Sequence, residues 1–159
     1  MKITIRSAEA SDTPVLMRLI RELAAFENME HLVEASEADI RREGFGPKPH
    51  FEAVLAERDG EALGFALFFH NFSTFMGKPG LYVEDLFVSE AARGTGLGRM
   101  LLAHLAGIAL ARGCPRLELS VLHWNPARAF YEKMGLAQNA DWLPYRVSGE
   151  ALQALAKKA

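Results

Sequence analysis

The chain has 159 residues, of which 50% are hydrophobic, 24% are charged and one is cysteine. Lysine and arginine together number 18 against 20 for aspartate and glutamate, so the charge balance gives no broad attraction for nucleic acid or an anionic membrane surface. This length and composition predict one globular domain, residues 1–159. A lone cysteine cannot form an internal disulfide, so we expect the protein in a reducing compartment such as the cytoplasm.

Hydrophobic periodicity and turn residues predict the elements in chain order. The expected elements are a strand at 3–6, a helix that starts within 11–14 and runs to 26, a helix at 36–42, a loop at 44–49, strands at 51–58 and 62–70, a turn region at 71–80, a strand at 81–88, a helix at 96–112, a strand at 115–122, a helix at 126–134, a strand at 144–147 and a helix at 148–157. The first helix is expected to carry a capping side chain before Pro14, and Asp59-Gly60 is typical of a tight hairpin turn.

This order places hairpins first and a strand–helix–strand crossover later. It predicts an α/β fold with a mixed sheet and helices on both faces. No stretch is long and apolar enough to predict a membrane-spanning helix, and no leader pattern opens the chain. The five histidines are scattered without metal-ligand spacing, so we expect no metal site.

The most informative stretch is a strand-like segment that carries Glu84 and Asp85 and leads into a glycine-rich turn at 93–98 and then a helix. Backbone N–H groups at such a helix start are suited to bind phosphate. A Walker loop is excluded because no Lys-Ser or Lys-Thr follows the last glycine, and a dinucleotide fingerprint fails because Arg99 stands where its third glycine belongs. A plain strand-to-helix bend is the remaining alternative.

The turn Arg93-Gly94-Thr95-Gly96-Leu97-Gly98 resembles the R-G-x-G-x-G motif of the GNAT superfamily of N-acetyltransferases. A second segment, 125–135, is similar to the family's N-x-x-A-x-x-F-Y-x-x-x-G pattern. Segments 20–24, 43–46 and 82–88 look like the diamine (spermidine/spermine) and thialysine acetyltransferase branch. The resemblance implies a splayed, mostly antiparallel sheet of six to seven strands, transfer of acetyl from acetyl-CoA to the primary amine of a small molecule, and a homodimer.

The resemblance also implies where acetyl-CoA binds. Its pyrophosphate is expected on the backbone of the glycine turn, and its pantetheine arm along an open strand edge. The implied cofactor-binding residues are Leu86, Phe87, Val88, Arg93, Gly94, Thr95, Gly96, Leu97, Gly98, Arg99, Asn125, Pro126, Ala127 and Arg128. A β-bulge near Glu84 and Asp85 is expected to open the slot.

The implied chemistry needs a base, because an aliphatic amine with a pKa near about 10 is protonated at neutral pH and has no lone pair. Glu84 matches the family position proposed for that base, and Tyr131 matches the general acid that protonates the leaving thiolate. Phe26, Glu27, Glu84 and Asp85 match substrate-binding positions. Direct attack in a ternary complex is favoured because Cys114 has no base nearby in the sequence.

The chain departs from the family pattern in two ways. Tyr131 lies six residues after Asn125, where the family usually has seven. Two acids of the diamine branch are replaced, one of them by Thr74, so we expect a smaller or less charged amine than spermine. Trp124 is interpreted as a packing residue. Protein or peptide N-acetylation and a silent acyl-CoA-binding module remain alternatives.

Overall fold

Five strands form one sheet in the computed structural model, which describes all 159 residues. The chain divides into two compact units, Met1–Asn125 and Pro126–Ala159, and the whole sheet lies in the first. The strands, in sheet order, are β1 (Ile3–Ser7), β2 (Glu52–Arg58), β3 (Glu61–Ser73), β4 (Lys78–Val88) and β5 (Leu117–Leu119). The first four pair antiparallel, and β5 runs parallel to β4. The predicted mixed, mostly antiparallel sheet is therefore confirmed.

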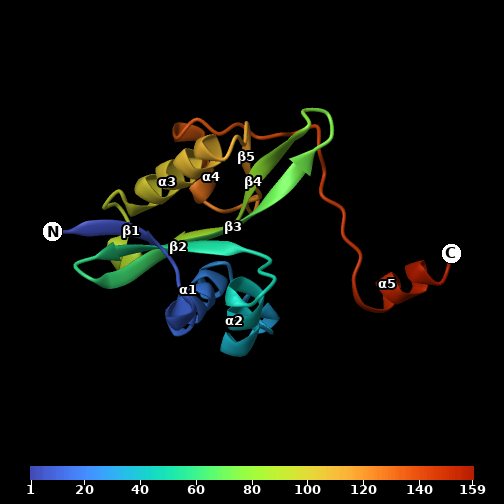
Figure 1. Ribbon diagram of the computed structural model, residues 1–159, viewed down its shortest axis with the longest axis horizontal. Helices are drawn as coiled ribbons and strands as arrows, with labels where there is room; N and C mark the ends of the chain where they lie inside the picture. The colour runs from blue at the N-terminus through green and yellow to red at the C-terminus, as the bar shows by residue number, and fades with distance from the viewer. The chain divides into compact units, whose positions relative to one another are not determined.

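Three long helices of the first unit cover the two faces of this sheet (Figure 1). Helices α1 (Thr13–Phe26) and α2 (Glu37–Phe45) pack on one face, which we call the α1 face. Helix α3 (Leu97–Ala111) connects β4 to β5 and packs on the opposite face, the α3 face. The prediction of helices on both faces is confirmed.

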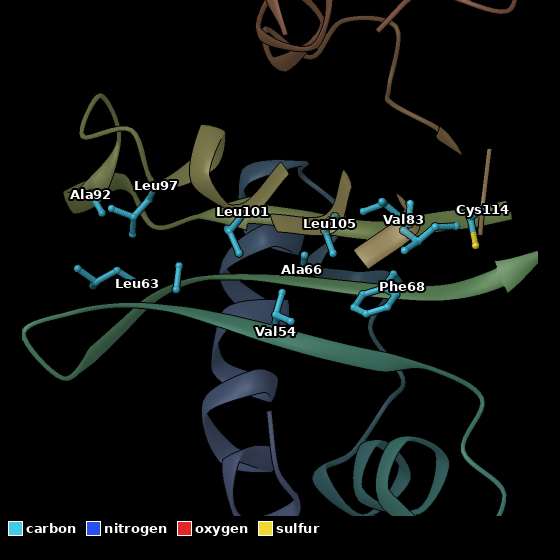
Figure 2. Close-up of a cluster of buried hydrophobic side chains, with 13 residues drawn as sticks. Val54, Leu63, Ala66, Phe68, Val83, Ala92, Leu97, Leu101, Leu105 and Cys114 are labelled. Carbon is cyan, nitrogen blue, oxygen red and sulfur yellow. The ribbon is translucent and has the colours of Figure 1, made fainter. Parts of the chain in front are cut away.

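The core on the α3 face is built by one side of α3 against the middle of the sheet. Leu97, Leu101 and Leu105 point from the helix toward β2, β3 and β4, where they meet side chains such as Phe68 and Val83 (Figure 2). All three leucines are at most 1% exposed. Burying such a side chain stabilises the fold by roughly 1.5–3 kcal/mol, so α3 and the turn before it are held firmly on the sheet.

Local turn and cap chemistry agrees with the sequence at two of three places. Asp59 and Gly60 both have positive φ, 51° and 85°, as a tight hairpin turn requires. Ser36 Oγ accepts a hydrogen bond from Asp39 N at 3.2 Å and caps α2, at the start of the helix expected at 36–42. The expected side-chain cap of α1 is wrong, because both carboxylate oxygens of Asp12 accept hydrogen bonds from the Arg6 guanidinium instead.

The strands differ in length from the predicted ones. Strand β3 runs on to Ser73 and β4 starts at Lys78, because the polar residues of the expected turn pair across the two strands, for example Asn71 with Gly80. Strand β5 keeps only three of the eight expected residues, since β4 offers it partners only from Leu81 to Val83.

The second unit holds two helices, α4 (Ala127–Lys133) and α5 (Gly149–Ala156). The strand expected at 144–147 is wrong, so the sheet has five strands in place of six to seven. A strand exists only where a neighbour satisfies its backbone groups, and Pro144 lacks an amide hydrogen. No helix in the structure has both the length and the apolar character needed to span a bilayer.

Candidate active site

A β-bulge interrupts β4 at Glu84. Asp85 pairs with Leu67 of β3, and the next pair is Val83 with Phe68, so Glu84 has no residue opposite it. The pairing of β4 with β5 also stops at Val83. From Glu84 to Val88 the outer edge of β4 therefore has no strand partner. The expected bulge is confirmed, and it stands where the sheet opens.

The bulge places two consecutive carboxylates on the same face of the sheet. Leu81 and Val83 pack in the core of the α3 face, and beyond the bulge Leu86 packs against that core again. Since side chains alternate along a strand, Glu84 and Asp85 both fall on the α1 face. Phe87, two residues after Asp85, lies in the core of that face.

A third carboxylate joins them from the end of α1. Burial raises the pKa of Asp85 from 3.8 to about 7, and the negative charges of Glu84 and Glu27 add to the rise. Burial also raises the pKa of Glu27, the residue that caps α1. The C-terminus of a helix carries partial negative charge. This arrangement favours a cation at the carboxylates, and its partly buried acid can exchange a proton near neutral pH.

An aromatic wall lies beside the carboxylates, formed by Phe26, Phe87 and Trp124. The ring of Phe26, the last residue of α1, has its centroid 6.4 Å from that of Phe87 and 6.3 Å from that of Trp124. Trp124 is 45% exposed. Because Phe26 directly precedes Glu27 and Phe87 follows Asp85 by two residues, the wall and the carboxylates belong to one region of the α1 face.

The side chain of Arg93 also lies on this wall. Its Cζ is 4.6 Å from the ring centroid of Phe26 and 5.6 Å from that of Phe87. Its Nε donates a hydrogen bond to the carbonyl oxygen of Val88 at 3.2 Å. Arg93 thus starts in the glycine turn but turns its guanidinium back over the end of β4.

The glycine turn exposes backbone N–H groups at the start of α3. Gly96 is the N-cap residue of α3 with φ 88°, and no side chain caps the helix. The backbone hydrogen bonds of this region stop at Arg93 N–H and resume at Met100 N–H, which donates to the Gly96 carbonyl. A Cβ built on Gly94 or Gly96 would meet no atom within 4 Å, so the space over the turn is open to a ligand. These features fit a phosphate group.

The other residues of the turn and of β4 have side chains committed elsewhere. Leu97 is buried in the core of the α3 face, and Thr95 Oγ1 donates to the carbonyl oxygen of Ala92. Leu86 and Val88 also pack toward the core of the α3 face. Only the backbone of these residues is available to an extended ligand, together with the exposed side chain of Arg99. Gly98, the second residue of α3, offers only backbone as well.

The second motif straddles the boundary between the two units. Asn125 is 8% exposed, ends the first unit, and donates its N–H to the Leu122 carbonyl at 2.9 Å. Pro126 is the N-cap residue of α4, and Ala127 and Arg128 form its first turn. In the same helix the ring of Tyr131 lies 5.4 Å from that of Phe130.

The structure adds two features that the sequence analysis missed. Trp124 was interpreted as packing, yet it forms the exposed end of the aromatic wall. The resemblance implies that Arg93 binds acetyl-CoA, and the structure adds that its guanidinium lies on this wall. Neither feature leaves a local signal, because both depend on where α1 ends in space. No group of three or more His, Cys, Asp or Glu is arranged to hold a metal ion.

The fold, the bulge and the open helix start define an acyl-transfer protein of a known class. Residues 16–136 match the acetyltransferase (GNAT) family, and the chain belongs to this family. It is therefore an acetyltransferase, and the enzymes of this family use acetyl-CoA as the acyl donor.

Two relatives with curated names are acetyltransferases that act on amines. The chain is 38% identical to a thialysine N-epsilon-acetyltransferase of Mus musculus over 96% of each protein. It is 31% identical to an L-ornithine N5-acetyltransferase of Arabidopsis thaliana, over 96% of this chain and 87% of that protein. Among solved structures it is similar to an integron cassette protein from the mobile metagenome of V. cholerae, with a TM-score of 0.84, 30% identity and 99% of each chain covered.

Proposed function

We propose that this protein transfers the acetyl group of acetyl-CoA to a primary amine of a small molecule, by direct attack in a ternary complex. The observation that carries the proposal is the β4 bulge, which puts Glu84 and Asp85 on one face where the sheet opens. An amine that arrives as an ammonium ion is attracted to these carboxylates and to Glu27. The thialysine and ornithine acetyltransferases among the relatives support an amine of this kind.

The donor site proposed for acetyl-CoA combines a phosphate cradle with an open strand edge. The backbone N–H groups of residues 94–99 are suited to the pyrophosphate, and charge-assisted hydrogen bonds of this type contribute roughly 1.5–3 kcal/mol each. The edge of β4 at 86–88 can pair with the amide groups of the pantetheine arm as a further strand does. By family resemblance, residues 125–128 are also expected to contact acetyl-CoA.

In the first step of the proposed reaction, a protein side chain removes a proton from the ammonium group of the acceptor. We assign this to Glu84, directly or through one water molecule, with Asp85 as the neighbouring charge that holds the cation. The free amine then attacks the acetyl carbon, so that a C–N bond forms and the C–S bond of the thioester breaks. Because no activated cysteine is needed, Cys114 can stay buried in the core.

The second task is to protonate the sulfur that leaves. A thiol has a pKa near about 8.5, so a proton donor speeds the departure of the thiolate at neutral pH. We assign this proton to the hydroxyl of Tyr131 by family resemblance. The attacking nitrogen gives up a second proton as the C–S bond breaks, and this proton returns the tyrosinate to its neutral form through solvent. The balance is then complete: the nitrogen has lost two protons, one has gone to the carboxylate, and the other replaces the proton that the tyrosine gave to CoA.

The proposal is tested by mixing pure protein with acetyl-CoA and a panel of amines and following thiol release. We expect release with short diamines and with amino acids that carry a side-chain amine, and a lower kcat/KM with spermine. A silent acyl-CoA-binding module gives no release with any amine, and a peptide acetyltransferase releases thiol only with peptides. Either result overturns the proposal.

Three further features remain proposals. We expect residues 1–159 to act as one domain, because the family match crosses the boundary between the two units. We expect a homodimer, and exposed Phe72, Phe75 and Met76 at the β3–β4 hairpin offer apolar surface for it. We place the protein in the cytoplasm, where the free thiol of Cys114 stays reduced.

A further inference from the structure

We infer that Glu22, in the middle of α1, is a positioning residue for acetyl-CoA: it holds Ser89 and, through Ser89, the glycine turn before α3. The inference rests on the proposed function, because it concerns the affinity of the proposed donor site. Glu22 acts through other residues of the chain, so its loss weakens acetyl-CoA binding and leaves the chemical step unchanged.

The carboxylate of Glu22 is held from two directions. Its Oε2 accepts a 2.6 Å hydrogen bond from Ser89 Oγ, and its Oε1 accepts one from Arg18 Nη1 at 2.7 Å. Arg18 in turn donates from Nη2 to the Ala62 carbonyl at 2.9 Å. Because both oxygens are engaged in charge-assisted or hydroxyl hydrogen bonds, the carboxylate has one orientation, and in this orientation it holds Ser89.

Hydrogen bonds continue from Ser89 to the glycine turn. Ser89 is the N-cap residue of the short 3-10 helix Glu90–Ala92, and its carbonyl accepts a 2.9 Å hydrogen bond from Ala92 N–H. The Ala92 carbonyl accepts a hydrogen bond from Thr95 Oγ1, inside the turn. Each of these two links spans three residues, so a displacement of Ser89 is passed on to Thr95 and to the glycines on either side of it.

The turn depends on such support because its glycines supply none. Gly94 and Gly96 have φ of 76° and 88°, and glycine has many accessible backbone conformations. Leu97 holds the end of the turn in the core of the α3 face, and Ser89 holds the segment before the turn. A binding loop that already has its bound conformation loses less entropy when the ligand binds. The contribution of Glu22 is therefore expected in the affinity for acetyl-CoA.

Calorimetry of acetyl-CoA binding tests the inference. Glu22→Met keeps the aliphatic stem and removes both oxygens, and we expect Kd for acetyl-CoA to rise about tenfold with kcat within about twofold of wild type. Glu22→Gln keeps a hydrogen-bonding partner for Ser89 and should recover most of the affinity. Glu43→Met is the matched control and should keep the wild-type Kd, because Glu43 is similarly exposed and pairs with an arginine of its own helix, α2.

A double variant shows whether Glu22 acts through Ser89. Ser89→Ala removes the hydroxyl and should raise Kd as much as Glu22→Met does. The two substitutions together should raise Kd no further, because they break the same bond. Effects that multiply show that Glu22 acts by another route, and the inference is then wrong. If Glu22→Met does not fold, Ser89→Ala measures the loss of the same bond.

The binding stoichiometry separates positioning from stability. A substitution that only destabilises the fold leaves part of the sample unable to bind, so the number of sites per chain falls while Kd stays as in wild type. That result, or a lower kcat with an unchanged Kd, overturns the inference and leaves the proposed function standing. A wild-type protein that binds no acetyl-CoA removes both.

Discussion

Ser89 Oγ donates a 2.6 Å hydrogen bond to Glu22 Oε2, which ties the end of β4 to the middle of α1. Ser89 is 7% exposed, and its N–H also bonds the Leu63 carbonyl. The contact holds the segment that precedes the glycine turn, where we propose that acetyl-CoA binds. It also holds α1, which ends at Phe26 and Glu27 beside the proposed amine site, so it connects the two proposed binding regions.

Replacing Ser89 by alanine is expected to lower the free energy of unfolding by about 1–2 kcal/mol, because a hydrogen bond to a charged group is lost in a buried setting. Urea unfolding measures this. Ser120→Ala is the control, since its hydroxyl bonds Tyr82 at the exposed surface and should change stability by less than about 0.5 kcal/mol. Equal effects of the two substitutions contradict the assigned importance of the Ser89–Glu22 bond.

Asp85 makes the stability of the protein depend on pH. Its pKa is raised to about 7 in the folded state, so the folded protein holds this proton where the unfolded chain releases it. Stability from this group is therefore present at low pH and is lost as the pH rises toward 7. With allowance for solvent screening, we expect Asp85→Asn to be more stable than wild type by about 1–2 kcal/mol at pH 8.

The same comparison at pH 4 supplies the control, because a protonated aspartate and an asparagine are both neutral. The stability difference should shrink to less than about 0.5 kcal/mol there. A difference that stays constant between the two pH values shows that Asp85 does not titrate as the structure indicates.

Glu84→Gln removes the proposed base and is expected to lower kcat/KM for the best amine about a hundredfold. Glu90→Gln is the matched control, because Glu90 lies in a short 3-10 helix after β4, and it should stay within about twofold of wild type. If Asp85 is the base instead, Glu84→Gln keeps its activity and the acidic limb of its pH profile moves to lower pH, since one charge that raises the pKa of Asp85 has gone.

Gly96→Ala is expected to raise KM for acetyl-CoA at least about tenfold and to cost about 1–2 kcal/mol of stability, because alanine is strained at φ 88° and its Cβ enters the proposed phosphate space. Gly60→Ala in the β2–β3 hairpin has nearly the same φ, 85°, and equally open space around its Cβ. It should cost similar stability and leave KM unchanged. A matching rise of KM in both variants points to general destabilisation.

Tyr131→Phe keeps the ring and removes the proposed proton donor. We expect kcat to fall about a hundredfold with little change in KM for acetyl-CoA. Tyr145→Phe serves as the control, because that side chain is 93% exposed. A Tyr131→Phe enzyme with wild-type kcat assigns the proton on the leaving sulfur to solvent.

Much of the fold follows from local patterns in the chain. The hairpin at Asp59-Gly60 and the cap at Ser36 are short-range signals, since the residues that define them are neighbours. The glycine turn before α3 is equally local. The strand expected at 144–147 is absent, because a strand needs a partner strand and no local pattern shows whether one is present.

The sequence by itself determined the order of strands and helices up to α4, the glycine turn and the presence of paired acids at 84 and 85, because these depend on residues close together in the chain. Only the tertiary structure decided that the bulge turns both acids to the α1 face, that Glu27 adds to the rise in the pKa of Asp85, and that Arg93 lies on Phe26. The physical reason is that charge, burial and stacking act through space. The residues of α1 meet those of β4 only when the sheet has formed and α1 has packed on it.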